Sequence, residues 1–291
     1  MATLPAEGRW SLRLLSEDDF KGALEFLQRD PLINVYLVSR LLDEKTLAAT
    51  QMAVVRYNGA IVLVASLATN IVLSGDPSIP KDITDAAVSL IGDRILTRML
   101  PVRAIISPVE LVEALWTDLR TRIDPPTVVR MNQPIYAVGA DVRSRAGYPD
   151  LTTGRYATMR DLDQLVPSCA AMHQEEVGID PLSRDALGYR ERIRELIEKK
   201  RAVVRVVDGV IATKCEYSAV TPDAVQLMGV WTHPRFRRQG LSRELLREIC
   251  GHMFLRGKTV TLFVNDFNLP AIALYESLGF ERIGMNRALI W

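Results

Sequence analysis

The spacing of hydrophobic residues is most regular in the second half of the chain, where it predicts a strand and two helices. Residues 156–160 are predicted as a strand, and residues 161–176 as a helix. The apolar side chains at helical spacing in that helix are Leu162, Leu165, Val166, Cys169 and Met172. Residues 183–200 are predicted as the second helix, with Ser183 as its N-cap and many charged side chains turned outward.

The rest of this half alternates between strands and helices. Strands at 202–207 and 210–219 meet at Asp208-Gly209, a dipeptide typical of tight hairpins. Further predicted elements are a strand at 224–232, a helix ending near Arg256, a strand at 259–264, a helix at 269–278, and short strands at 280–283 and 288–291.

The first half follows a similar order of elements. Its predicted elements are a strand at 12–15, two helical patterns within 18–42 broken at Pro31, strands at 52–57 and 60–67 joined at Asn58-Gly59, a strand at 71–73, a helix at 83–91, a strand at 103–106, a helix at 109–119 and a strand at 135–138. Residues 141–154 are polar and contain Gly and Pro, so they are predicted as a linker between domains at 1–140 and 155–291. The shared order suggests a structural duplication, although we see no repeat of individual residues.

Composition restricts the class of protein. The 291 residues are 48% hydrophobic and 24% charged, which is typical of a globular protein, and the net charge is +1. This balance argues against a nucleic acid or a membrane as partner. Cys169, Cys215 and Cys250 are odd in number and widely spaced, so neither a disulfide framework nor a metal site is expected. Without a signal pattern or a long apolar run, we expect a cytoplasmic protein.

A basic turn follows the strand at 224–232. The stretch RFRRQGLSRELL, residues 235–246, gathers four arginines and Gly240 where a helix begins. Backbone N–H groups at a helix N-terminus lack partners within the helix and attract anions, phosphate above all. Gly240 leaves room for a diphosphate to approach them, and the arginines add charge. The alternative interpretation is an ordinary charged surface turn.

A second cluster lies in VNDFNLPAIALYESLGFERIG, residues 264–284. Asn265 and Asn268 lie between a strand and a helix, and Tyr275 comes seven residues after Asn268. That distance is about two helical turns, so both side chains are expected on one face. An N-cap asparagine and a partly buried tyrosine would explain the same residues.

The two clusters together resemble the GNAT superfamily of acyl-CoA-dependent N-acetyltransferases. The family signature R/Q-x-x-G-x-G/A matches residues 237–242, except that Ser242 stands where the family has Gly or Ala. The segment N-x-x-A-x-x-L-Y-x-x-x-G-F matches residues 268–280 without a gap. The resemblance implies an α/β (α+β) fold with a mixed, mostly antiparallel central sheet flanked by helices. It also suggests that the first half is a degenerate copy of the same domain.

The resemblance further implies a site for acetyl-CoA, with no metal. The cofactor-binding residues would be Val230, Trp231, Thr232, Arg237, Arg238, Gln239, Gly240, Leu241, Ser242, Arg243, Asn268 and Tyr275. A strand amide near Val230 would polarise the thioester carbonyl, and Tyr275 would protonate the departing thiolate. The amine acceptor must lose a proton before it attacks, and the candidate bases are Glu216, Glu175 and Glu176.

The resulting hypothesis is an N-acetyltransferase that acts by direct attack of a primary amine on acetyl-CoA. The acceptor would be a small-molecule amine or an amine of a protein or peptide. A non-catalytic acyl-CoA sensor is the alternative, and a tRNA- or peptidoglycan-linked aminoacyl transferase is a third interpretation without a basic stripe to support it. No pattern in the sequence indicates an oligomeric state.

Overall fold

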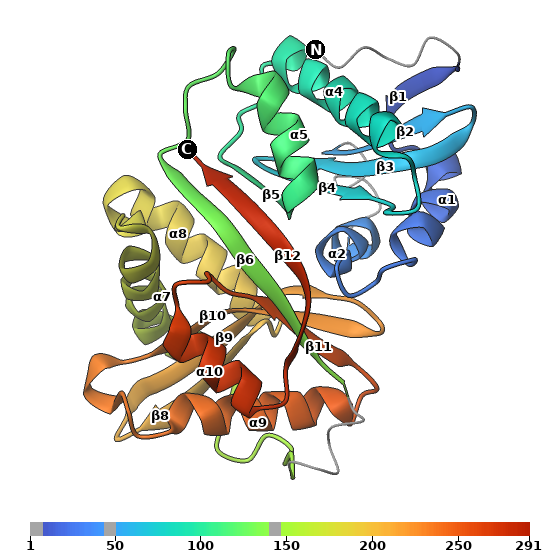
Figure 1. Ribbon diagram of the computed structural model, residues 1–291. Helices are drawn as coiled ribbons and strands as arrows, with labels where there is room; N and C mark the ends of the chain where they lie inside the picture. The colour runs from blue at the N-terminus through green and yellow to red at the C-terminus, as the bar shows by residue number, and fades with distance from the viewer. Residues whose placement is uncertain (1–7, 44–50, 140–146) are drawn as a thin grey trace. The chain divides into compact units, whose positions relative to one another are not determined.

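The computed structural model describes residues 8–43, 51–139 and 147–291. The chain divides into two compact units (Figure 1). The first unit contains Met1–Ile135, Val264–Asn268 and Arg282–Trp291, and the second contains Tyr136–Phe263 and Leu269–Glu281. The first part of the predicted linker, residues 141–146, lies outside the described residues, and the boundaries at 140 and 155 stay a prediction.

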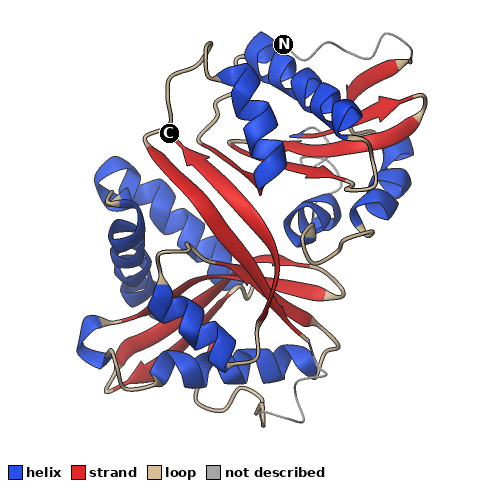
Figure 2. Cartoon of the chain, in the orientation of Figure 1, coloured by secondary structure: helices blue, strands red, loops and turns tan. Residues whose placement is uncertain are grey.

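The first unit is a mostly antiparallel sheet with helices on both faces (Figure 2). Its elements are β1 (Trp10–Leu14), α1 (Glu17–Leu27), α2 (Val35–Asp43), β2 (Met52–Tyr57), β3 (Ala60–Leu67), β4 (Asn70–Gly75), α4 (Lys81–Arg98), β5 (Ala104–Pro108), α5 (Val109–Leu119) and most of β6 (Val128–Val138). The sheet order is β1-β2-β3-β4-β5-β12-β6, and β4 and β5 are parallel. One core cluster lies between the sheet and α4 and α5, and another between the sheet and α1 and α2.

The second unit repeats this design. Its elements are β7 (Arg155–Tyr156), η2 (Met159–Asp161), α7 (Leu162–Val177), α8 (Pro181–Glu198), β8 (Ala202–Val207), β9 (Val210–Val220), β10 (Ala224–Thr232), η3 (Pro234–Phe236), α9 (Leu241–Phe254), β11 (Thr259–Phe263) and α10 (Leu269–Ser277). The sheet order is β11-β10-β9-β8-β7, with β10 and β11 parallel and the other pairs antiparallel. Helices α7 and α8 cover one face through a core that includes Leu165, Ile193 and Ile211.

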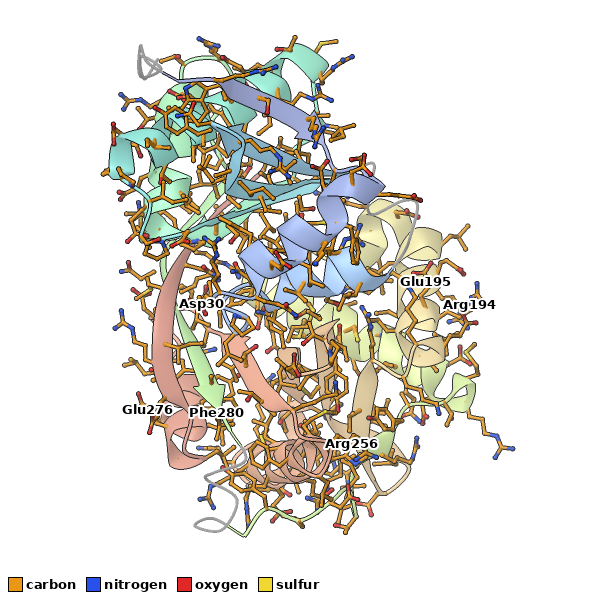
Figure 3. All side chains as sticks on the ribbon, turned by 90° about the vertical axis from the view of Figure 1, so that its right-hand side faces the viewer. Asp30, Arg194, Glu195, Arg256, Glu276 and Phe280 are labelled. Atoms are coloured by element: carbon orange, nitrogen blue, oxygen red, sulfur yellow. The ribbon has the colours of Figure 1, made fainter. Side chains whose placement is uncertain are left out.

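Helix α8 differs from the prediction at its start. Its N-cap is Asp180 rather than Ser183, and Asp180 accepts a hydrogen bond from the Leu182 N–H. Asp185 has non-helical dihedral angles (φ −156°, ψ 82°) and accepts a bond from the Gly188 N–H, so a new helical segment begins there. The outward charges are confirmed, with Arg194 and Glu195 labelled on this helix in Figure 3.

The two hairpins are formed as predicted. Asn58 and Gly59 have φ of 50° and 87°, and Asp208 and Gly209 have φ of 50° and 75°. Two successive residues with positive φ are what a two-residue hairpin loop requires, and Asn-Gly and Asp-Gly adopt this conformation readily. The turn chemistry therefore fixed these two strand pairs.

A residue-level repeat, absent from the sequence interpretation, becomes visible at the start of each unit. Arg13 and Ser16 both bond the carboxylate of Asp19, at 2.5 and 2.7 Å. Arg155 bonds Asp161 at 2.7 Å, and Thr158 bonds it at 2.9 Å. Both sets have the spacing R-x-x-[ST]-x-x-D, in which an arginine of the first strand neutralises the acidic residue of a capping box.

The last strand, β12 (Glu281–Ile290), contributes almost entirely to the first unit. It pairs antiparallel with β5, in a register that sets Leu289 opposite Ile105 (Figure 1, red strand). The prediction of two short strands at 280–283 and 288–291 was wrong, because Gly284 continues the strand instead of interrupting it. Among the described residues, no helix is long and apolar enough to cross a membrane.

Candidate functional site

Two parallel strands of the second unit, β10 and β11, are paired only at their starts, so β10 runs on alone toward the basic turn. The register between β10 and β11 comprises Ala224, Val225 and Gln226 of β10 and goes no further along that strand. The following residues of β10, up to Thr232, therefore have no β11 partner in the register on that side. A strand edge of this kind can pair with an extended ligand through its backbone.

A β-bulge interrupts β10 within this unpaired stretch. Met228 pairs with Glu216 and Trp231 with Lys214, so Gly229 and Val230 together stand opposite one residue of β9. Gly229 has φ of 60°, and a Cβ there would come within 3.0 Å of the Glu216 carboxylate and 3.1 Å of the Lys214 ammonium. Both the dihedral angle and the close approach require glycine.

The basic turn presents a series of unpaired amides. Arg238 and Gly240 adopt positive φ, 59° and 79°, and α9 begins at Leu241 with Gly240 as its N-cap. No protein acceptor is recorded within the described chain for the backbone N–H groups of residues 238–243, and no side chain caps the helix. A Cβ on Gly240 would meet open space, so the glycine is needed for its conformation and for access. Residues 237–240 are exposed.

The arginines of this turn are not equivalent. One terminal nitrogen of Arg237 donates to both oxygens of Glu175, at 2.7 and 2.8 Å, and its Nε donates to the Thr232 carbonyl at 3.1 Å. Arg243 donates to the Ser277 hydroxyl at 3.3 Å. In the part of the chain that the structure describes, no partner is recorded for the side chain of Arg238. Arg238 is therefore the arginine most available to an anion.

Glu175 lies at the end of α7 and is held by two donors rather than being freely solvated. It accepts from Arg237, and the Trp231 indole N–H donates to it at 3.3 Å. These bonds connect α7 with the end of β10 and with the basic turn. The structure thus brings together four predicted site residues, Glu175, Trp231, Thr232 and Arg237.

Ser242, which departs from the family signature, points toward the sheet. Its hydroxyl is hydrogen-bonded to the Thr232 hydroxyl. The Thr232 hydroxyl in turn donates to the Thr213 hydroxyl at 3.3 Å. Because the Ser242 hydroxyl is turned toward β10, it leaves open the space in front of the backbone amides of residues 238–243. The serine thus fastens the start of α9 to the end of β10.

Tyr275 is buried in the middle of α10, 7% exposed, with its ring against Phe280. Burial, and the proximity of Cys215 and Glu176, raise the pKa of its phenol well above the ordinary value. The phenol therefore keeps its proton at neutral pH. Asn268 immediately precedes α10, and its backbone N–H donates to the Asn265 carbonyl at 2.9 Å. Its role in cofactor binding stays a prediction.

Glu216 lies in a buried cluster rather than on an open surface. Lys214 donates to Glu216 Oε1 at 2.6 Å, the Cys169 thiol donates to the same oxygen at 3.2 Å, and Arg192 lies 3.7 Å from Oε2. Burial opposes ionisation of Glu216, but the charges of Lys214 and Arg192 together lower its pKa. The carboxylate is thus ionised and already paired.

Lys214 was missed by the sequence interpretation. It is fully buried, and its ammonium also donates to the Gly229 carbonyl at 2.9 Å. Burial disfavours its charge, yet the adjacent Glu216 carboxylate raises its pKa above the ordinary value. A signal was present: two charged residues at alternate positions of the apolar strand VIATKCEYSAV must share one face.

The corresponding turn of the first unit is occupied by the protein itself. Between β4 and α4, Asp76 accepts from the Ser78 N–H at 2.9 Å and is paired with Arg29 at 2.5 Å. The N-cap of α4 is Pro80, which has no N–H. The Ser107 hydroxyl of β5 accepts from the Leu73 N–H at 2.8 Å and so satisfies a backbone donor of β4.

Comparison with known proteins agrees with this geometry. A family model described as the acetyltransferase (GNAT) family matches residues 169–280. The N-alpha-acetyltransferase RimI of Mycobacterium tuberculosis is 38% identical over 66 residues, 23% of this chain and 40% of that protein. The ribosomal protein bS18-alanine N-acetyltransferase of Escherichia coli K12 is 41% identical over 69 residues, 23% of this chain and 47% of that protein. The chain thus covers less than half the length of these relatives.

A tandem GNAT protein from the clavulanic acid biosynthesis pathway has a similar fold over both halves. Its TM-score is 0.57 at 15% identity, with 98% of each chain covered. Residues 169–280 therefore match the GNAT acetyltransferase family, and the chain is similar in fold to a tandem GNAT protein. In the described ranges, His, Cys, Asp and Glu form no group of three suited to a metal ion.

Proposed function

We propose that the second unit is an N-acetyltransferase that uses acetyl-CoA to acetylate a primary amine of a protein or peptide. The observation that carries the proposal is the series of unpaired amides at residues 238–243, which begins in an exposed turn and ends at a positive helix terminus beside the unpaired charge of Arg238. A diphosphate satisfies several such donors at once. The diverging edge of β10 leads directly into this turn and suits an extended arm.

The amides of residues 238–243 and the side chain of Arg238 bind the diphosphate. When bound, acetyl-CoA supplies an acetyl thioester whose carbonyl carbon the neutral amine attacks. Val230 and Thr232 offer backbone groups along the strand edge, and the Val230 N–H is the proposed donor to the thioester oxygen. Tyr275 keeps a proton on its phenol and delivers it to the departing sulfur.

Among the predicted bases, Glu175 and Glu176 fit deprotonation of the amine better than Glu216. Glu216 is ionised but engaged by Lys214, Arg192 and Cys169, and a carboxylate with a lowered pKa is a weak base. Glu175 and Glu176 are exposed at the end of α7. Glu175 is also paired, with Arg237, but its side chain is 47% exposed and therefore reachable by an acceptor, whereas that of Glu216 is 1% exposed. Two carboxylates there also favour a cationic acceptor, such as the N-terminus or a lysine of a peptide.

The matching relatives support a protein or peptide acceptor, because one of them is named for acetylation of an alanine of ribosomal protein bS18. A small-molecule amine is the alternative acceptor. Peptides with a free and with a blocked N-terminus, a lysine peptide and small polyamines, each incubated with acetyl-CoA, distinguish these classes by mass spectrometry.

The test uses Gly240→Glu, which places a carboxylate in front of the amides. We expect acetyl-CoA binding, measured by calorimetry, to weaken at least tenfold, about 1.4 kcal/mol or more. Gly257→Glu is the matched control, since Gly257 also has positive φ (69°) and open space but follows the opposite end of α9. Equal affinity in the wild type and the Gly240→Glu variant would contradict the proposal. Tight binding without an acetylated product from any amine would instead favour the sensor.

A further inference from the structure

A fully buried lysine is unusual in a strand of a protein core. The hydrogen-bond partners of Lys214 indicate a role at the proposed reaction centre. Its side chain and that of Glu216 are 0% and 1% exposed. Charged residues are rarely buried to this extent, because removing a charge from water is costly. An apolar pair would fill the same space at no such cost, so the pair calls for a reason beyond packing.

The ammonium of Lys214 is bonded to the β-bulge of β10. It donates to the Gly229 carbonyl at 2.9 Å and to Glu216 Oε1 at 2.6 Å, and it lies 3.4 Å from the Met172 sulfur. Gly229 and Val230 have no partner in the registers with β9 and β11. The bulge therefore depends on Lys214 for the position of its carbonyl.

The peptide group between Gly229 and Val230 transmits the effect of the Lys214 charge from one side of β10 to the other. The Gly229 carbonyl and the Val230 N–H belong to one peptide unit, which is trans, so the two bonds point in opposite directions. A cation bound to the carbonyl polarises the whole unit and makes its N–H a stronger donor, because linked hydrogen bonds reinforce one another in a low dielectric. The Val230 N–H is the donor proposed above for the thioester oxygen.

We propose that Lys214 is a positioning residue that fixes and polarises the Gly229–Val230 peptide as an oxyanion donor, while Glu216 compensates its charge. This inference rests on the proposed function. Negative charge develops on the thioester oxygen only as the amine adds, so a stronger donor accelerates turnover without tighter binding of acetyl-CoA.

Glu216 and its neighbours keep the cation in place. Glu216 faces Cys169 of α7 and Arg192 of α8, and Arg192 lies 5.7 Å from the ring centroid of Tyr189. The negative charge of Glu216 thus lies between two cations. The Glu216 carboxylate raises the pKa of Lys214 above its ordinary value, so the ammonium is charged at neutral pH.

The experiment replaces both charges at once with Lys214→Met/Glu216→Leu, which keeps the volume and leaves no buried charge unpaired. We expect this variant to fold and to bind acetyl-CoA with unchanged affinity, but to turn over about tenfold more slowly. The carbonyl stretch of bound ¹³C-acetyl-CoA, measured by difference infrared spectroscopy, should lie closer to its value in water than in the wild type.

The core variant Ile193→Ala is the control for lost stability, because Ile193 is fully buried in the apolar core beneath α7 and α8 and carries no charge. It should lower the melting temperature and leave the carbonyl frequency unchanged. If the apolar double variant does not fold, Lys214→Gln/Glu216→Gln, which keeps hydrogen-bonding groups without charge, replaces it. Unchanged turnover and carbonyl frequency in a folded double variant would overturn the role of Lys214 but leave the proposed acetyltransferase function intact. If the wild type binds no acetyl-CoA, the proposed function fails and this inference fails with it.

Discussion

Tyr275 is the proposed proton donor to the departing thiolate. It is buried against Phe280, and its raised pKa keeps the phenol protonated at neutral pH. Tyr275→Phe removes the proton and leaves the ring in place. We expect turnover to fall roughly 10²-fold while acetyl-CoA affinity, measured by calorimetry, stays within twofold. An unchanged turnover would remove Tyr275 from the role of acid.

Glu248 is a buried carboxylate of α9 that stabilises the loop before β7. It accepts bonds from the backbone N–H groups of Thr152, Thr153 and Gly154 and from both threonine hydroxyls. Burial opposes its charge, but these bonds hold its pKa at about 2, below the ordinary value of 4.5. Its contribution to stability is therefore present above pH 4.5 and is lost as the pH falls toward 2.

Glu248→Gln should therefore lower the free energy of unfolding at pH 7 by about 2 kcal/mol. The difference from the wild type should shrink as the pH falls from 5 toward 2, because the wild-type carboxyl then takes up its proton. Urea unfolding at a series of pH values measures this. A difference that is constant across the range would show that the carboxylate charge is not what stabilises the loop.

At the scale of elements, β12 pairs with β5, a strand that is remote from it in sequence. Leu289 is 3% exposed and packs in the core of the first unit with Ile105 and Leu115. Leu289→Ala should cost about 2–5 kcal/mol in urea unfolding. Ile283→Ala on the same strand, where Ile283 is 38% exposed, should cost less than half as much. Equal costs would mean that β12 packs elsewhere in solution.

A glycine with positive φ lies at each end of α9, and only one of the two lies beside the proposed anion site. Gly240 begins the helix with positive φ beside open space, and Gly257 follows its end in the same conformation. Only Gly240 adjoins unpaired N–H groups, because a helix presents amides at its start and carbonyls at its end. The same residue type thus has opposite electrostatic surroundings at the two ends.

The two units have the same order of elements but differ in their turns. In the first unit, the Asp76 carboxylate lies in the turn before α4 and is paired with Arg29. In the second unit, the turn before α9 has unpaired amides and no such carboxylate among the described residues. We therefore expect one acetyl-CoA to bind per chain. Calorimetric titration gives this number directly, and Gly240→Glu should abolish the whole signal rather than half of it.

Much of the fold was predictable because it depends on neighbouring residues. Asn58-Gly59 and Asp208-Gly209 predicted both hairpins, and the helix at 109–119 was placed correctly. Local signals were misread at Asp180, where Pro181 at the first helical position marked the true start of α8. The pairing of β12 with β5 could not be predicted, because alternation shows that a strand exists but not which strand it joins.

The candidate site was predictable to a similar extent. The basic turn and the Asn-to-Tyr segment were found because their residues are contiguous in sequence. The contacts of Glu175 with Arg237 and Trp231, and of Lys214 with Gly229, join residues that are far apart in sequence or on different strands. Such contacts depend on strand register and on how α7 packs against the sheet, which a single sequence does not specify.

The position of β12 also sets the order of events during biosynthesis. Its residues leave the ribosome after the whole second unit, and Leu289 and Arg287 contact residues that emerged much earlier, including Ile105 and Glu113. The nascent first unit therefore keeps an open edge at β5 until β12 has been synthesised. Maturation of the first unit is thus coupled to synthesis of the second unit, which carries the proposed chemistry and precedes β12 in the chain.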